Sequence, residues 1–295
     1  MLGSKLLYYL IILPISKIPT PLLYGFSNVT YYLMYYVIKY RKKVVQDNIQ
    51  KAFPNKSEQE VVETSKLFFR HLCDLIFESV KNFSISEKEL KRRIVYTGTD
   101  CAKPFADMQK NGIGLAGHYG SWETCSVEFG SIPHHQHYGI IKPLANKFFN
   151  EKILTSRTKF KTQIVPMKEV KHFFQKKHAD LFSLTFIADQ WPSNPKKCHW
   201  TTFLGRETPF FFGAEKYARE YNLPVFYFDV HRVKRGWYSV EMSVLCEDPS
   251  SLTYKGELID LYVKKLEKTI LRNPAYYLWS HKRWKKSKAE VFGES

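Results

Sequence analysis

The chain has 295 residues, of which 44% are hydrophobic, so it is long enough for one large domain with a substantial core. Its 45 Lys and Arg residues against 28 Asp and Glu give a net charge of +17, which predicts an anionic partner such as nucleic acid, acidic lipid, a phosphorylated substrate or an acidic carrier protein. Five widely spaced cysteines without a C-x-x-C pair argue against a disulfide framework or a zinc knuckle and indicate a reducing compartment.

Two apolar runs open the chain, at residues 6–15 and 22–38, and a proline-containing segment separates them. The first is shorter than a transmembrane helix needs, and the second contains small and polar residues. No basic region with an A-x-A-like cleavage site is present, so we expect the segment to be retained. Its many tyrosines and the basic stretch at 39–43 favour helices lying at a membrane surface, with the following chain on the cytoplasmic side. The alternative is two buried helices of a soluble domain.

No repeat or linker divides the rest of the chain, so we predict membrane-associating helices in residues 1–45 and one domain in residues 46–295. That domain begins with an amphipathic pattern up to Lys81, in which Ser57 and Glu60 form a capping-box signature. Short apolar runs then alternate with stretches long enough for helices; the runs are IGLAG, YGII, TQIVP, LFSLTFIAD and LPVFYFDV. The alternation predicts an α/β fold with a mixed, largely parallel sheet flanked by helices.

Polar side chains follow two of these runs at the points where strands would end. His118 follows IGLAG, and Asp189 ends LFSLTFIAD. Because ligands bind beyond the carboxyl ends of parallel strands, the two residues could face one crevice.

His118 is also followed, five positions later, by Glu123 across a predicted strand-to-helix turn. A histidine can take a proton from a hydroxyl, and a carboxylate on its other ring nitrogen would fix the tautomer. Gly117 and Gly120 leave room for a substrate, and free N–H groups at the helix start could stabilise an oxyanion. The alternative is a loop histidine beside a favourable charge in a first helical turn.

Two further clusters favour simpler interpretations. The histidines of HHQH, at 134, 135 and 137, lack partner carboxylates or thiols, so a solvated loop is favoured over a metal site. The stretch WSHKRWKK at 279–286 mixes tryptophans with cations, which suits an interfacial patch near anionic headgroups, or a solvated basic tail.

Six segments resemble one known family in order and over nearly the whole chain. They are YRKKVVQDNIQKAFP, GHYGSWE, KPLANKFFNEKILTSR, IADQ, FLGRETPFFFGAEKYARE and NPAYYLWSHKRWK. The set is similar to the bacterial lipid A late acyltransferases, the Kdo-dependent lauroyl and myristoyl transferases, which share a His-x4-Asp/Glu motif with the glycerolipid acyltransferases. The resemblance implies a glycerolipid-acyltransferase-like fold with His118 as general base and Glu123 as its partner.

The resemblance also implies a set of residues that shape or line the cleft for acceptor and acyl donor. These are Arg157, Asp189, Gln190, Thr208 and Glu215. Simpler alternatives remain for two of them, because Arg157 could pair with a helix carboxylate such as Glu151 and Asp189 could cap a strand end.

The implied function is direct transfer of an acyl chain from acyl carrier protein to a hydroxyl of a lipid A precursor, without cofactor or metal, at the cytoplasmic face of the bacterial inner membrane. The implied partners are acyl carrier protein, an anionic lipid acceptor and the membrane surface. Coenzyme A as donor, and an aminolipid, glycolipid or lysophospholipid as acceptor, remain alternatives. So does a non-catalytic protein bound to a membrane surface. Nucleic-acid binding is disfavoured because no helix-turn-helix, zinc or RNP-like motif is found.

Overall fold

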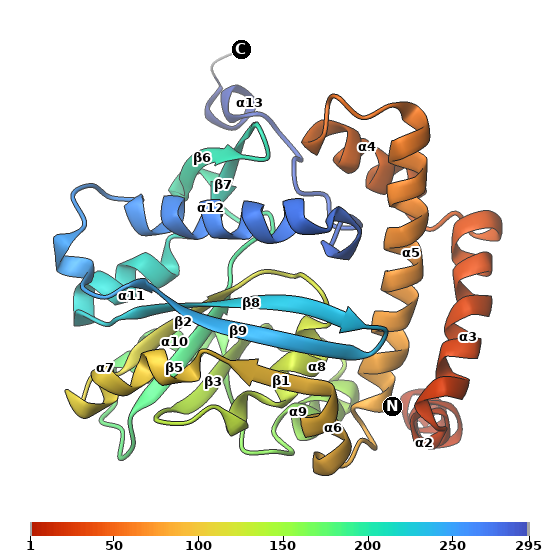
Figure 1. The fold of residues 1–295 in the computed structure, drawn as a ribbon, viewed down its shortest axis with the longest axis horizontal. Helices are drawn as coiled ribbons and strands as arrows, with labels where there is room; N and C mark the ends of the chain where they lie inside the picture. Colours follow the sequence, from red (N-terminus) through yellow and green to blue (C-terminus); the bar gives the residue numbers. More distant parts are fainter. Residues whose placement is uncertain (1, 294–295) are drawn as a thin grey trace.

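Seven strands form a mixed sheet in the computed structural model, which describes residues 2–293 (Figure 1). In spatial order the strands are β1 (Ile94–Thr97), β9 (Trp237–Cys246), β8 (Val225–Lys234), β2 (Gly112–Ala116), β5 (Phe182–Ile187), β3 (Gln136–Ile141) and β4 (Gln163–Pro166). All neighbouring strands run parallel except β8 and β9, which form an antiparallel hairpin. The predicted mixed, largely parallel sheet is therefore confirmed.

The five apolar runs of the sequence correspond to β2, β3, β4, β5 and β8. Every residue of β2 is buried, as expected of a central parallel strand covered on both faces. The predicted runs leave out β1 and β9, and also β6 (His199–Phe203) and β7 (Arg206–Phe210), which form a separate antiparallel pair. That pair lies apart from the sheet, beyond α12 (Figure 1).

Helices cover both faces of the sheet. Because neighbouring residues of a strand point to opposite faces, Phe226 of β8 packs on Phe105 of α7 (Lys103–Asp107) while Tyr227 lies beside Tyr262 of α12 (Glu257–Arg272). α11 (Gly213–Tyr221) lies on the α12 side (Figure 1) and stacks against α10 (Val170–Gln175). The remaining helices of the body are α4 (Lys42–Ala52), α6 (Glu87–Arg93), α8 (Trp122–Val127), α9 (Lys147–Arg157) and α13 (Lys288–Phe292).

The long helix α5 (Glu58–Lys81) runs across the end of the sheet toward which β8 points (Figure 1). It begins with the predicted capping box, in which Ser57 and Glu60 each bond the other's backbone N–H. Its buried residues recur at helical spacing and include Phe68, Phe69 and Cys73, so the amphipathic helix expected from the sequence is confirmed.

The N-terminal region consists of α1 (Leu2–Leu7), α2 (Leu13–Lys17) and α3 (Thr20–Tyr32), with π-helical turns at Tyr8–Ile12 and Leu33–Val37. One side of these helices packs inward and buries Leu23, Tyr31 and Tyr35. The other side leaves large apolar side chains exposed, among them Leu10, Leu22, Phe26, Val29, Val37 and Ile38. No single helix within residues 2–293 is long and apolar enough to cross a bilayer, but 2–17 and 20–37 pass that test together as a pair bent by 119°.

The segment after residue 278 is bonded to α4 and is not a free tail in solvent. The side-chain amide of Asn48 donates to the carbonyls of Trp279 and His281, both at 2.8 Å, and Arg41 donates to the carbonyl of Ser280 at 3.0 Å. Trp279 is 1% exposed and Arg283 2% exposed. The predicted interfacial patch is therefore wrong for these two residues, because α4 draws the segment into the core, whereas Lys282, Lys285 and Lys286 are exposed.

The histidines of HHQH also differ from the expected solvated loop. His134 is exposed, but His135 and His137 are buried, because β3 begins at Gln136 and its alternation turns His137 inward against Phe129 and Phe228. Burial lowers the pKa of His137 to about 3. No group of three His, Cys, Asp or Glu side chains suited to a metal ion occurs among residues 2–293.

Candidate active site

The adjacent parallel strands β2 and β5 bring His118 and Asp189 together. Ala116 pairs with Ile187 in register, so the chain leaves both strands at the same edge of the sheet. Nδ1 of His118 lies 2.5 Å from Oδ1 of Asp189, and the backbone N–H of His118 donates to Oδ2 at 2.8 Å. The two strand-end residues therefore meet, and Asp189 holds the histidine by ring and backbone. That they face one ligand crevice stays a prediction.

Asp189 is a buried carboxylate with a depressed pKa. Its side chain is 1% exposed, and burial by itself would raise its pKa. The charge of His118 and the two hydrogen bonds from that residue outweigh burial, with help from the charge of Arg283, so the pKa of Asp189 lies below its ordinary value. The carboxylate therefore stays ionised and accepts a hydrogen bond from Nδ1–H of His118.

The other ring nitrogen of His118 faces Gln190. The amide nitrogen of Gln190 lies 3.2 Å from Nε2, and the indole of Trp122 meets the imidazole edge-on at 5.3 Å between ring centroids. With the Nδ1 proton directed at Asp189, Nε2 carries a lone pair and accepts from Gln190. The side chain of His118 is 17% exposed, so the ring is partly accessible to solvent.

Glu123 has a different partner from the one expected. Its carboxylate binds Arg157 at the end of α9 through a two-pronged contact, with Nη2 2.6 Å from both carboxylate oxygens and Nε 3.1 Å from Oε2. Within the described residues Glu123 has no hydrogen bond to His118, and Asp189 occupies the Nδ1 position instead. The expected His118–Glu123 pairing is therefore not the one observed, because α8 turns Glu123 toward α9. Arg157 likewise pairs with Glu123 rather than with Glu151.

Thr208 and Glu215 lie away from His118 and are fully buried. The hydroxyl of Thr208 donates to the carbonyl of Arg206 and accepts from the indole N–H of Trp284, both at 2.8 Å. Glu215 accepts the backbone N–H of Gly256 at 2.8 Å, at the start of α12, and pairs with Arg219 at 2.9 Å. Their contacts anchor the C-terminal segment and the start of α12.

Two residues of the C-terminal segment join the site although sequence patterns did not single them out. His281 accepts the backbone N–H of Trp191 through Nε2 at 2.9 Å. Arg283 donates to the carbonyl of Pro209 at 2.8 Å and lies over the ring of Phe210 at 4.4 Å. The motif SHKRWK contains both residues, but basic residues beside tryptophans are equally typical of a surface patch, so the motif alone did not indicate a site.

Cys125 is the nearest thiol in sequence to the histidine, and it is buried. Burial raises the pKa of its thiol, and the charge of Glu78 raises it further. A neutral buried thiol is a poor nucleophile, so Cys125 is not suited to a covalent role in catalysis.

Gly120 fixes the loop that carries His118. Its φ is +60°, its N–H donates to the carbonyl of Tyr276 at 3.0 Å, and its carbonyl accepts from Nε2 of His71 at 3.3 Å. A Cβ on this residue would lie 2.7 Å from Cγ1 of Val230. The loop conformation therefore requires glycine here.

Gly120→Ala is expected to lower the free energy of unfolding by about 2 kcal/mol, through left-handed strain and the contact with Val230. Because the shift would displace His118, any activity that depends on this residue should fall at least about ten-fold. Urea unfolding and initial rates measure the two effects. Gly205→Ala is the control: its φ is +73° with nothing within 4 Å of the added Cβ, so stability should fall while activity is retained. Equal activity losses would contradict the role given to Gly120.

A search of curated proteins found no match. A comparison with protein families did find one: the model of a family described as bacterial lipid A biosynthesis acyltransferase matches residues 3–286. The matched range includes His118, Asp189 and nearly all of the N-terminal helices. The chain therefore belongs to the bacterial lipid A biosynthesis acyltransferase family.

Proposed function

We propose that this acyltransferase moves a fatty acyl chain from an acyl carrier protein thioester to a hydroxyl of a lipid A precursor at the cytoplasmic face of the inner membrane. The observation that carries the proposal is the contact between His118 and the ionised Asp189, which leaves Nε2 as the basic nitrogen of the ring. Acyl transfer to a hydroxyl needs such a base, because the hydroxyl must lose its proton as it attacks.

In the proposed reaction the acceptor hydroxyl displaces Gln190 from Nε2 of His118. The oxygen bonds to the thioester carbonyl carbon while Nε2 takes the hydroxyl proton, and the charge of Asp189 stabilises the imidazolium that forms. The carbon–sulfur bond then breaks, and the departing sulfur takes the proton back from Nε2. No acyl group is attached to the protein at any stage, and the products are an ester and a free thiol.

Glu123 and Arg157 have a positioning role in this proposal. The two-pronged contact ties Glu123, in the first turn of α8 and five residues after the base, to the last turn of α9. It engages Nε and Nη2 of Arg157, so Nη1 would donate to an anionic oxygen of the acceptor. Backbone N–H groups at the start of α8 would stabilise the oxyanion of the tetrahedral intermediate.

Donor and membrane assignments rest on charge and exposure. A net charge of +17 favours a donor with an acidic surface, which fits acyl carrier protein better than a small thioester. The exposed apolar side of α3, with Leu22, Phe26 and Val29, suits burial in the interfacial region of a bilayer. The basic residues at 39–43 favour the cytoplasmic face.

The test is transfer of radiolabelled acyl chain from acyl carrier protein or coenzyme A to a panel of acceptors, with wild type and His118→Ala. The panel contains a Kdo-bearing lipid A precursor, a lysophospholipid, an aminolipid and a glycolipid. We expect transfer to the lipid A precursor from acyl carrier protein, reduced at least about a hundred-fold in the variant.

Transfer that survives in folded His118→Ala would remove this residue as the base. Transfer only to another acceptor would replace the lipid A assignment while leaving the chemistry intact.

A further inference from the structure

A second polar site lies between the N-terminal helices and the tip of the β8–β9 hairpin. A cavity of about 420 Å³ opens there, walled by α3, α5, the hairpin tip and residues 273–276. We call it the arginine pocket, because Arg70, Arg232 and Arg235 line it, together with Asp74, Tyr31 and Tyr276. Three guanidinium groups from two elements thus converge on one cavity.

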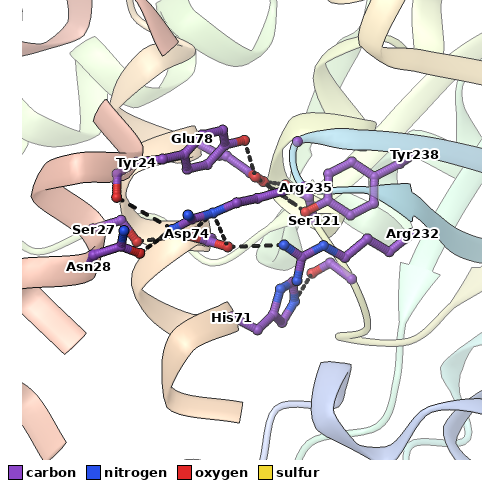
Figure 2. A network of polar contacts seen from close by, with 12 residues as sticks. Tyr24, Ser27, Asn28, His71, Asp74, Glu78, Ser121, Arg232, Arg235 and Tyr238 are labelled. Atoms are coloured by element: carbon purple, nitrogen blue, oxygen red, sulfur yellow. Dashed lines mark hydrogen bonds and ion pairs between the residues drawn. The ribbon is translucent and has the colours of Figure 1, made fainter. Parts of the chain in front are cut away.

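Figure 2 shows the polar contacts that Asp74 makes within this pocket. Arg235 binds both oxygens of Asp74 through Nε at 3.0 Å, and Arg232 donates to Oδ2 at 3.0 Å. The hydroxyl of Ser27 donates to Oδ1 at 2.7 Å. The carboxylate is therefore saturated by partners other than Arg70.

Arg70 has no carboxylate partner within residues 2–293. It is exposed and lies over the ring of Tyr31, with its guanidinium carbon 5.1 Å from the ring centroid. Three guanidinium groups against one carboxylate leave two positive charges uncompensated in the pocket. Such charges, presented as planar forks of N–H groups, match the oxygens of a phosphate.

The pocket is separate from the acyl-transfer site. His118 contacts Asp189, whereas the next residue, Tyr119, donates from its hydroxyl to the carbonyl of Asn273 at 3.0 Å, a residue of the pocket wall. Neither His118 nor Asp189 lines the pocket, so the two sites share no lining residue. The backbone of Tyr276, which lines the pocket, also bonds the N–H of Gly120.

The rim of the pocket is apolar, and this favours the phosphate of a lipid over free phosphate as the ligand. Leu67 is 53% and Tyr32 56% exposed, and both line the cavity. They continue onto the exposed apolar side of α3, with Val29 at 59%. A free anion gains nothing from such a rim, whereas a lipid places acyl chains against it and its headgroup among the cations.

We propose that the arginine pocket binds the phosphate of an anionic membrane lipid headgroup. The proposal does not depend on which acceptor is acylated or on His118, because His118 does not line the pocket. A headgroup held there would dock the N-terminal helices in a defined orientation and support the loop through Tyr276.

The test measures co-sedimentation of the full chain with vesicles of phosphatidylcholine alone, with added phosphatidylglycerol, or with added oleate at the same surface charge. Oleate supplies negative charge without phosphate. We expect wild type to prefer the phosphatidylglycerol vesicles, and Arg70→Gln to lower that preference about five-fold. Arg70→Glu should lower it further. Arg70 is exposed and unpaired, so both variants should keep the wild-type melting temperature.

Arg206→Gln is the matched control, since Arg206 is also exposed and lies over an aromatic ring, that of Trp284, outside the pocket. Equal losses in the Arg70 and Arg206 variants, or equal binding to oleate and phosphatidylglycerol, would reduce the effect to general surface charge and overturn the proposal. A melting-temperature rise with inorganic phosphate that needs Arg70, combined with vesicle binding that does not, would assign the pocket to free phosphate and overturn the lipid source.

Discussion

Asp189→Asn is expected to lower kcat for acyl transfer by about 10⁴-fold while leaving the chain folded. The asparagine fills the same space, but its amide no longer fixes the Nδ1–H tautomer of His118 or stabilises the imidazolium. The effect should fall on kcat rather than on KM, because the carboxylate lies behind the ring and does not reach the acceptor. Steady-state kinetics with acyl carrier protein as donor measure it, and circular dichroism checks the fold.

Glu123→Gln is the comparison that separates the two carboxylates. Glutamine keeps one oxygen that can accept from Arg157. We therefore expect kcat to fall only about ten-fold, because Arg157 is held less firmly while His118 remains the base. If Glu123→Gln proved the more damaging change and Asp189→Asn were mild, the pairing predicted from the sequence would describe the working enzyme better than the observed contact does.

Acidification is expected to destabilise the fold through two buried histidines. Burial lowers the pKa of His71 and of His137 to about 3 each, whereas an unfolded histidine has a pKa near 6.5. Below that unfolded value the unfolded chain binds protons that the folded chain does not, so stability falls as the pH drops from about 6.5 toward the folded value. At pH 5 each histidine should cost about 2 kcal/mol, or about 4 kcal/mol together.

Urea unfolding at pH 7.5 and pH 5 measures this loss, and His137→Phe tests its origin. Both ring nitrogens of His137 are buried and have no hydrogen-bond partner within residues 2–293, so phenylalanine keeps the packing and removes the titration. The variant should lose about 2 kcal/mol less than wild type between the two pH values. His134→Phe, at the exposed neighbour, should leave the difference unchanged. An unaltered pH dependence in His137→Phe would show that His137 is not responsible.

The centre of the fold could be predicted because its strands are covered on both faces. β2, β5 and β8 are therefore continuous apolar runs, and two of them end in His118 and Asp189, so the meeting of these residues followed from the strand ends. β9 was harder to find, because it alternates buried residues with partly or fully exposed ones such as Glu241. The predicted boundary between residues 1–45 and 46–295 remains a prediction.

The partners of single side chains could not be predicted in the same way. Spacing placed Glu123 near His118 along the chain, but its direction depends on Arg157, 34 residues later, on a helix whose position the spacing does not fix. Arg283 was similarly ambiguous, because a cation between aromatic residues fits a membrane surface and a buried pocket equally well. In both cases the deciding neighbour is distant in sequence.

The bonds from Asn48 to the carbonyls of residues 279 and 281 also set an order of events during synthesis. Asn48 leaves the ribosome 231 residues before Trp279, which at about 5–20 residues per second is a delay of roughly 10 to 50 s. The apolar N-terminal helices leave the ribosome before the segment with His281 and Arg283, which completes the surroundings of Asp189. During this interval the helices are already available for contact with a bilayer, whereas the histidine site is still incomplete.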